Sequence, residues 1–214
     1  YQRKGDIVLE IENDLFDKGY MHIACIDEVG RGCLFGDVVA CAVIMPRGLQ
    51  IDGIKDSKKL SPKKREMLYD IIMDNCIAYG FGSVDCKKID EINIKESTRL
   101  AMKMAVENLL DKQGNRIVPD FILIDAEKIY MDIPQEGIIK GDDKCYGIAC
   151  ASILAKVYRD RKCIEWGKMY PEYKIEKHKG YATKEHIEAI IEHGITPLHR
   201  NTFLKKILAG STNE

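Results

Sequence analysis

Residues 23–45 decide the fold, and they read IACIDEVGRGCLFGDVVACAVIM. The first apolar run, residues 23–26, has the length and composition of a strand and is followed by the acidic pair Asp27-Glu28. A turn punctuated by glycines comes next, and residues 38–45 then form a second run that is almost wholly apolar. Such a run predicts a strand that is buried on both faces of a sheet. Two strands in succession, with no helix between them, predict a mixed sheet.

Strands and helices alternate around this stretch. Apolar runs predict three further strands, at residues 77–84, 121–124 and 138–139. Helical periodicity and end signals, such as Ser61 before Pro62 and Thr183 as a cap, predict helices over residues 1–20, 61–75, 95–111, 146–162 and 183–194. The pattern predicts an α/β fold with a central mixed β-sheet flanked by helices. A length of 214 residues fits a single domain over residues 1–214.

Carboxylates follow three of the apolar runs: Asp27 and Glu28 the first, Asp125 the run at 121–124, and Asp142 the run at 138–139. An acid at the tip of a buried strand lies at the sheet edge where ligands of α/β folds bind. Carboxylates that converge there would repel each other unless cations neutralised them, and magnesium and manganese prefer oxygen ligands. Four carboxylates around two metal ions is an arrangement used for phosphodiester hydrolysis.

A plainer interpretation of these acids stays open. Aspartate is common at turns, so each acid taken alone is more often a turn residue than a metal ligand. Adjacent residues of a strand point to opposite faces, so Asp27 and Glu28 share a site only if the backbone turns at that point. Gly30 and Gly32 supply such a turn.

Positive charge is concentrated in two segments, although the chain as a whole is nearly neutral. The 33 Lys and Arg almost balance 34 Asp and Glu, which leaves a net charge of -1. Residues 55–65 and 156–184 are strongly basic, whereas residues 1–28 are acidic. A charge run is often only a solvated face, but Lys and Ser side chains also bind phosphates. The distribution is therefore compatible with a nucleic-acid partner, whose binding would weaken as salt rises.

Neither secretion nor a membrane span is predicted. The longest apolar run is strand-sized, far below the roughly 20 residues that cross a bilayer, and residues 1–14 lack the pattern of a signal peptide. Eight cysteines occur without a C-x-x-C pair, which indicates small buried thiols in a reducing compartment rather than a disulfide framework or a zinc site. We expect a cytoplasmic monomer.

Seven blocks of sequence carry a resemblance to a known family. They are IDEVGRG (26–32), DSKKLS (56–61), LID (123–125), KGD (140–142), ASILAKVYRD (151–160), HKGY (178–181) and HRNTF (199–203). Together, and in this order, they resemble type 2 ribonuclease H, the ribonuclease HII family. Any one block would be weak, whereas the combination is specific.

The resemblance implies a ribonuclease H-like fold with a helical C-terminal extension from about residue 165. It implies an endonuclease that cuts RNA in RNA–DNA hybrids and incises duplex DNA 5′ to single ribonucleotides, leaving 3′-hydroxyl and 5′-phosphate ends. Carried over by motif, Asp27, Glu28, Asp125 and Asp142 are catalytic acids that hold two divalent cations, magnesium or manganese. The neighbouring Asp143 is a rival for Asp142, and the KGD block aligns the first of the two.

The resemblance also assigns contacts with the substrate. Gly30, Arg31 and Gly32 match the turn that senses the 2′-hydroxyl, largely through backbone groups. Tyr181 matches a tyrosine that packs on the neighbouring deoxyribose and checks that the next nucleotide is DNA. The remaining assigned side chains are expected to bind phosphates: Ser57, Lys58, Lys59 and Lys156.

The ASILAKVYRD block also contains Arg159, which we expect to flank the acids and hold phosphates, and Asp160, which we interpret as structural. The chain departs from the family pattern at Cys33 and Asp37, where proline is usual, and at Cys150, where alanine is usual. The first two adjoin the Gly-Arg-Gly turn. None of these departures removes a catalytic group.

Two other functions stay open. One is a nucleic-acid-binding module without catalysis, which the presence of all four acids argues against. The other is a different two-metal phosphohydrolase, such as a junction resolvase, which the Gly-Arg-Gly and His-Lys-Gly-Tyr blocks argue against. The sequence leaves undecided the preferred metal, the relative activity on long hybrids and single ribonucleotides, and whether a sliding clamp binds the C-terminal tail.

Overall fold

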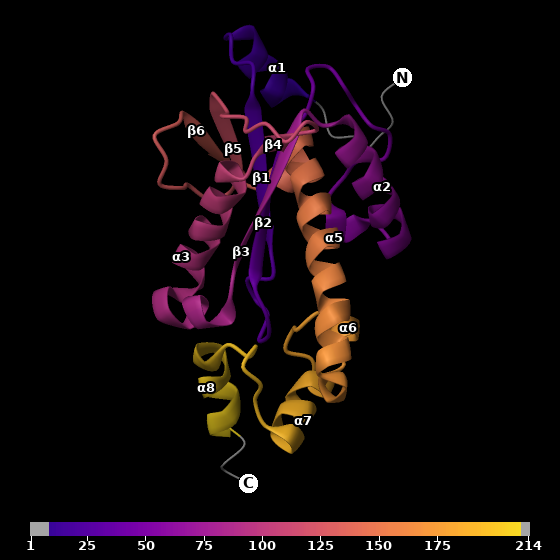
Figure 1. Cartoon of the computed structure of the whole chain (residues 1–214), viewed down its shortest axis with the longest axis vertical. Coiled ribbons are helices and arrows are strands. Elements are labelled where there is room, and N and C mark those ends of the chain that lie inside the picture. Colours follow the sequence, from indigo (N-terminus) through magenta and orange to yellow (C-terminus); the bar gives the residue numbers. More distant parts are fainter. Residues whose placement is uncertain (1–8, 211–214) are drawn as a thin grey trace.

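A six-stranded sheet forms the centre of the computed structural model, which describes residues 9–210 (Figure 1). Its strands are β1 Ile23–Val29, β2 Val38–Ile44, β3 Ala78–Val84, β4 Leu110–Asp111, β5 Phe121–Asp125 and β6 Gln135–Ile138. They lie in the order β4-β3-β2-β1-β5-β6. Because β1 pairs antiparallel with β2 and parallel with β5, the predicted mixed sheet is confirmed.

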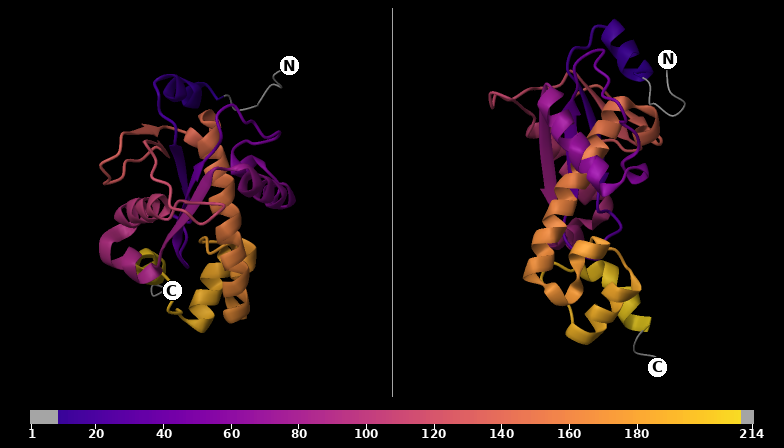
Figure 2. Two further views of the ribbon diagram at one scale, coloured as in Figure 1. Left: turned by 45° about the horizontal axis from the view of Figure 1, so that its top comes forward. Right: turned by 90° about the vertical axis from the view of Figure 1, so that its right-hand side faces the viewer.

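Helices cover both faces of this sheet (Figures 1 and 2). They are α1 Glu10–Asp17, α2 Pro62–Asn75, α3 Cys86–Glu107, α4 Gly141–Lys144, α5 Tyr146–Met169, α6 Ile175–His178, α7 Lys184–His193 and α8 Asn201–Gly210, with 3-10 turns η1 Ser57–Lys59 and η2 Pro171–Tyr173. One face of β1 and β2 packs on α3 and the other on α5. All residues of β2 are therefore buried, as its apolar sequence predicts.

Two glycines of β3 bring α3 unusually close to the sheet. A Cβ atom on Gly82 would lie 1.9 Å from the carbonyl oxygen of Ala101, and one on Gly80 would lie 2.3 Å from that of Ala105. Glycine weakens a strand because it has no side chain to pack. Here the missing side chains let the backbone of α3 rest directly on β3.

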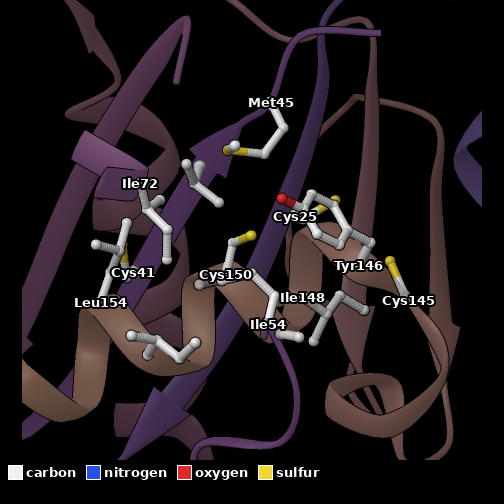
Figure 3. Close-up of a cluster of buried hydrophobic side chains, with 14 of the residues drawn as sticks. Cys25, Cys41, Met45, Ile54, Ile72, Cys145, Tyr146, Ile148, Cys150 and Leu154 are labelled. Atoms are coloured by element: carbon white, nitrogen blue, oxygen red, sulfur yellow. The ribbon is translucent and has the colours of Figure 1, made fainter. Parts of the chain in front are cut away.

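α5 runs through the interior, as Figure 3 illustrates. Residues 146–155 of this helix are all buried, which follows from a sequence that is apolar on every side of the helix. In Figure 3, Cys150 and Leu154 of α5 lie among side chains that include Cys41 of β2 and Ile72 of α2. The eight cysteines are all buried and unpaired, which confirms the prediction of small buried thiols.

The N-terminus of α5 is held by a carboxylate from α1. The Glu12 Oε1 atom accepts hydrogen bonds from Gly147 N at 2.8 Å and from Cys145 Sγ at 3.2 Å. Donor atoms of Glu12, Cys25 and Cys145 lie within 4.8 Å of one another, but burial raises the pKa of Cys145 well above its usual value and keeps it a thiol. Glu12 is therefore a cap on α5, because its carboxyl oxygen accepts from an N–H group at the start of the helix that would otherwise be free.

The C-terminal helices enclose a cluster of their own beyond the end of the sheet (Figure 1). Phe35, from the connection between β1 and β2, is buried in this cluster and packs edge-on against Trp166 of α5 and against His199. The helical C-terminal region predicted from the resemblance is thus present. It is joined to the turn that follows β1.

Two predicted helices have different bounds in the structure. The helix predicted over 146–162 continues to Met169 as α5, because its later turns face the C-terminal cluster. The helix predicted over 95–111 is the second half of α3, Cys86–Glu107. Asn93 interrupts α3 with φ 68°. Its side-chain oxygen accepts hydrogen bonds from the backbone N–H groups of Lys95 and Glu96, which is why the helical pattern begins again near residue 95.

Other predictions need smaller corrections. The strand predicted at 138–139 ends at Ile138. Of the helix predicted over 1–20, α1 covers Glu10–Asp17, and residues 1–8 lie outside the described residues. Within residues 9–210, none of the helices is long and apolar enough to cross a membrane.

Candidate active site

A cavity of about 350 Å³ opens where β1 and β5 end. Ten of the twelve residues predicted for the site line this cavity: Asp27, Glu28, Gly30, Arg31, Gly32, Ser57, Lys58, Asp125, Lys156 and Tyr181. Val29 and Ser152 also line it. Asp142 and Lys59 lie beside the cavity. Asp142 is bound to Lys58, and Lys59 forms ion pairs with Asp143 and Asp56.

Asp27 is the most enclosed of the acids in the cavity, with 6% of its surface exposed. Burial raises its pKa well above the usual value, and the negative charges of Glu28 and Asp125 raise it further. A hydrogen bond from Ser152 and one from the Glu28 N–H, which lies 2.8 Å from Oδ1, act in the opposite direction. The site therefore contains more negative charge than its hydrogen bonds compensate.

The turn expected near the two acids begins after Val29, at Gly30 with φ 90°, so Glu28 still follows Asp27 in the same strand. β1 continues to Val29, and Glu28 opposes Ala40 in β2. The two acids nevertheless border one cavity, because the pairing of β1 with β5 stops at Ile26 and leaves the end of β1 open on that side.

Within residues 9–210, one oxygen of Glu28 has no hydrogen-bond partner. Oε1 lies 3.3 Å from Arg31 Nη1, whereas Oε2 is buried without a hydrogen bond. Burial raises the pKa of Glu28, Arg31 lowers it and Asp125 raises it. A buried carboxylate oxygen without a donor is costly unless another group binds it.

Asp125 and Asp142 are joined through the backbone of α4. The Gly141 N–H donates to Asp125 Oδ1 at 2.7 Å. Burial raises the pKa of Asp125, this hydrogen bond lowers it, and the charge of Asp142 raises it. Lys58 Nζ lies 3.2 Å from Asp142 Oδ2 and is the nearest cation to that acid.

Asp142 does not sit at a strand end, as predicted, but in the first turn of α4. Lys140 adopts the left-handed conformation, with φ 57°, and this bend after β6 turns the chain back toward Asp125. The side chain of Asp142 is 9% exposed, whereas that of its rival Asp143 is 41% exposed and paired with Lys59. The geometry thus favours Asp142 over Asp143.

The four carboxylates form a donor set suited to divalent cations. Burial and mutual repulsion raise the pKa of three of them, Asp27, Glu28 and Asp125. Glu28 Oε2 still lacks a partner. Oxygen-only ligands with excess negative charge are what magnesium and manganese prefer, so the residues present fit such ions.

Two buried arginines lie against the Gly-Arg-Gly turn, residues 30–32: Arg159 packs beside Gly30, and Arg200 binds the carbonyl oxygen of Arg31. Arg159 is fully buried and donates to the carbonyl oxygens of Phe35, Asp37 and Lys179 at 3.0, 3.0 and 2.8 Å. The expectation that Arg159 holds phosphates beside the acids is therefore wrong, because no part of its side chain reaches the cavity. Arg200, equally buried, donates to the carbonyl oxygens of Gly36 and Arg31, each at 2.9 Å.

The basic side of the cavity consists of η1 and one face of α5. Ser57 is buried and its hydroxyl lies 2.8 Å from that of Ser152, so it is anchored beside Asp27. The side chain of Lys58 is 81% exposed. Lys156 lines the cavity and pairs with Asp160 at 2.8 Å, and Asp160 also pairs with Arg65, which agrees with a structural role for that acid.

A sequence model described as Ribonuclease HII matches residues 24–206. A ribonuclease HII from Alkaliphilus oremlandii is 58% identical over 200 residues, which cover 94% of this chain and 98% of that protein. The chain belongs to the ribonuclease HII family.

Solved structures agree with this membership. The ribonuclease H2 from Pyrococcus horikoshii OT3 matches with a TM-score of 0.72 and 26% identity, over 91% of this chain and 100% of that one. Bst-RNase HIII in complex with Mn²⁺ matches with a TM-score of 0.67 and 18% identity, over 92% of this chain and 72% of that one, which is a likeness of fold. The predicted ribonuclease H-like fold is confirmed, and this member of the ribonuclease HII family is an endoribonuclease.

The structure adds residues that the sequence reasoning did not assign. Ser152 lines the cavity and contacts both Asp27 and Ser57; its position four residues before Lys156 in one helix was a signal for it. Arg200 holds the backbone of Arg31 from 169 residues away. In the sequence, Arg200 was only part of the matched HRNTF block, and no role was predicted for it.

Proposed function

We propose that this ribonuclease HII family member hydrolyses the RNA of RNA–DNA hybrids and incises duplex DNA on the 5′ side of single embedded ribonucleotides, leaving 3′-hydroxyl and 5′-phosphate ends. One observation carries the proposal: three of the four acids, Asp27, Glu28 and Asp125, border one cavity with the Gly-Arg-Gly turn and Tyr181. Groups suited to hydrolysis and groups suited to reading a sugar are thus within reach of the same nucleotide.

Asp27, Glu28, Asp125 and Asp142 would hold two divalent cations, magnesium or manganese. When bound, such ions supply an activated water and stabilise the leaving oxygen of the sugar. The chain's contribution is to hold Asp27, Glu28 and Asp125 near one another at a cost that the raised pKa values of these three acids express. The hydrogen bonds from Ser152 to Asp27 and from Gly141 N to Asp125 orient two of them.

The Gly-Arg-Gly turn is suited to contact a sugar through its backbone. A Cβ on Gly32 would lie 3.8 Å from Cε1 of Tyr181, so a side chain there would grow into the space next to the tyrosine ring. The absence of a side chain lets backbone groups approach closely. A 2′-hydroxyl, which distinguishes RNA from DNA, can both donate to and accept from such groups.

Tyr181 stands on the other side of this space. Tyr181 lines the cavity, and 42% of the surface of this residue is exposed. Its ring is therefore available to pack on a deoxyribose. Lys58 and Lys156 lie at the same opening and are suited to bind phosphates on either side of the reacting bond.

The test is incision of duplex DNA that carries one ribonucleotide, with magnesium or manganese supplied. We expect a single cut 5′ to the ribonucleotide, and no incision with either metal would overturn the proposal. Asp125→Asn should abolish incision and leave binding largely intact, whereas the matched change Asp143→Asn, on the exposed neighbour of Asp142, should retain it.

The same experiment separates the alternatives. A binding module without catalysis would retain the duplex on a gel shift and leave both strands intact. A junction resolvase would cut four-way DNA junctions without any ribonucleotide. Cleavage that depends on the ribonucleotide excludes both.

A further inference from the structure

A hydrogen-bonded pair of buried histidines lies behind Tyr181. His186 of α7 and His199, which precedes α8, are 0% and 1% exposed, and their Nε2 atoms lie 3.3 Å apart. His186 Nδ1 lies 2.9 Å from the carbonyl oxygen of Tyr181. His199 Nδ1 lies 2.9 Å from the backbone nitrogen of Thr196. The two imidazoles therefore connect the backbone of Thr196 with that of Tyr181.

The two ends of this connection fix the direction of each hydrogen bond. His199 Nδ1 faces both the Thr196 N–H at 2.9 Å and the Thr196 hydroxyl at 3.0 Å. The N–H can only donate, and the hydroxyl can donate as well as accept, so Nδ1 accepts and a neutral His199 carries its proton on Nε2. That proton faces His186 Nε2, which must accept, so His186 carries its own proton on Nδ1. His186 then donates to the Tyr181 carbonyl, which can only accept.

Both rings are neutral near pH 7. Burial lowers the pKa of His186 and of His199 to about 4. A second proton on either ring would place two donors opposite each other, between the rings or against Thr196. His178 stacks on His186 with ring centres 4.4 Å apart, but its Nε2 is engaged by the Tyr173 carbonyl at 2.7 Å and does not compete.

The backbone that leads to Tyr181 is constrained residue by residue. Lys179 and Gly180 both have positive φ, 56° and 82°, a conformation that lysine adopts only when its surroundings support it. Their carbonyl oxygens are bound by Arg159 Nη1 and Leu34 N, each at 2.8 Å.

The Tyr181 carbonyl has two donors, His186 Nδ1 and Thr183 N at 2.8 Å. Thr183 is only two residues further along the chain, so its hydrogen bond to the Tyr181 carbonyl lies within the local turn and does not fix the position of that turn in the protein. His186 is the donor that ties this turn to the interior of the C-terminal cluster, through His199. The side chain of Tyr181, by contrast, lines the cavity and has a hydrogen bond with the side chain of Cys33.

We propose that His186 and His199 are positioning residues, which use one fixed pair of tautomers to hold the Tyr181 backbone and thereby set where its ring meets the nucleotide after the ribonucleotide. The inference rests on the proposed function, in which that ring distinguishes DNA from RNA at this nucleotide. Neither histidine contacts substrate or the acids. Their contribution is to selectivity rather than to the hydrolysis itself.

The tautomers can be measured without any activity. Nitrogen-15 NMR of the free protein at pH 7 should show His186 protonated on Nδ1 and His199 protonated on Nε2, both neutral. The opposite tautomers, or a charged ring in the pair, would overturn the inference. Because this measurement uses no substrate, it decides the inference separately from the proposed function.

The matched variants His186→Asn and His186→Gln test the role in selectivity. An asparagine amide stands at the δ position and can still donate to the Tyr181 carbonyl, whereas a glutamine amide stands at the ε position and faces His199. The readout is the ratio of incision rates on a ribonucleotide followed by DNA and on an all-RNA strand. His186→Gln should lower this ratio about fivefold, as expected for loss of one hydrogen bond, and His186→Asn should keep it within about twofold.

A double-mutant cycle distinguishes positioning from general damage. In a Tyr181→Ala background, His186→Gln should not lower the ratio further, because the ring that it positions is gone. An equal loss with Asn and Gln, or a further loss in the Tyr181→Ala background, would overturn the inference. If the wild-type protein made no incision, the proposed function would fail, while the NMR result would still decide whether the pair holds Tyr181.

Discussion

The guanidinium of Arg159 fills the space that a side chain on Gly30 would need. A Cβ atom on Gly30, whose φ is 90°, would lie 2.3 Å from Arg159 Nε. Arg159 cannot move aside, because three carbonyl oxygens fix its position. Glycine at position 30 is therefore a requirement of the fold, in addition to any contact that the turn makes with a substrate.

Gly30→Ala should destabilise the protein. The positive φ and the contact with Arg159 both oppose a methyl group, so we expect the melting temperature to fall by at least about 4 °C in a chain of this size. Differential scanning calorimetry measures this. An unchanged melting temperature would mean that Arg159 yields, contrary to its three hydrogen bonds.

Gly32→Ala should behave in the opposite way. A methyl group at this position lies 3.8 Å from the Tyr181 ring, at ordinary contact distance, so the melting temperature should stay within about 2 °C. Incision at a single ribonucleotide should fall at least about tenfold, since the methyl group projects into the space for the sugar. The pair of variants separates structure from function within one turn, and full activity of Gly32→Ala would contradict our assignment of the turn.

The acids make the metal-free protein less stable as pH rises. Burial raises the pKa of Asp27, Glu28 and Asp125, so the folded state binds protons more tightly there than the unfolded state does. The stability from these protonated groups is fully present below the unfolded pKa values and is lost as pH rises through the folded ones. With EDTA present, their contribution should therefore decline toward neutral pH.

Asp27→Asn removes one of these charges. In EDTA at pH 7 it should raise the melting temperature by about 2 to 4 °C, the shift that about 1 kcal/mol produces in a chain of this size. Magnesium should stabilise the wild-type protein and have little effect on the variant. Asp143→Asn is the control, since it should leave the response to magnesium intact; a lower melting temperature for Asp27→Asn in EDTA would refute the charge argument.

Lys58→Ala should weaken binding to every duplex by a similar factor. Its side chain is 81% exposed at the cavity, so we expect it to neutralise one phosphate. The slope of log affinity against log salt should decrease in magnitude by about 1. Binding is measured by fluorescence anisotropy in the Asp125→Asn background, which we expect to be inactive. Lys103→Ala, on α3 and away from the cavity, should leave the slope unchanged, and a loss confined to one nucleotide sequence would exclude a phosphate contact.

Glu12→Ala should destabilise the protein by about 1 to 3 kcal/mol, because it leaves the Gly147 N–H of α5 buried without an acceptor. Urea denaturation measures the change in the free energy of unfolding. The exposed Glu10 of the same helix is the control, and its change to alanine should cost less than about 0.5 kcal/mol. Equal effects at both positions would argue against the cap.

The sheet was predictable because its signals are local. Residues 23–45 contain two apolar runs and a glycine turn, and each run alone indicates a buried strand. The position of Asp142 was not predictable in the same way. It depends on the left-handed backbone conformation of Lys140, which cannot be predicted from the presence of a lysine.

The errors in the site have a common physical origin. Arg159 is a charged residue near the C-terminal half of a helix, a pattern typical of the surface, yet it is buried because segments from 35–37 and 179 surround it with carbonyl oxygens. The contacts of Arg159 with Phe35 and Asp37 join residues more than 100 positions apart, as does the contact of Arg200 with Arg31. Hydrophobic periodicity along the sequence does not predict such long-range contacts.

α5 carries residues of two different parts of the site on one rigid body. Ser152 touches Asp27, and Arg159 binds the carbonyl that precedes Gly180 and Tyr181. Seven residues of helix separate them, a rise of about 10 Å. In the proposed function, a fixed length of helix therefore sets the distance between the acids that would cleave and the tyrosine ring that would contact the next nucleotide, so the length of α5 would determine which bond is cut.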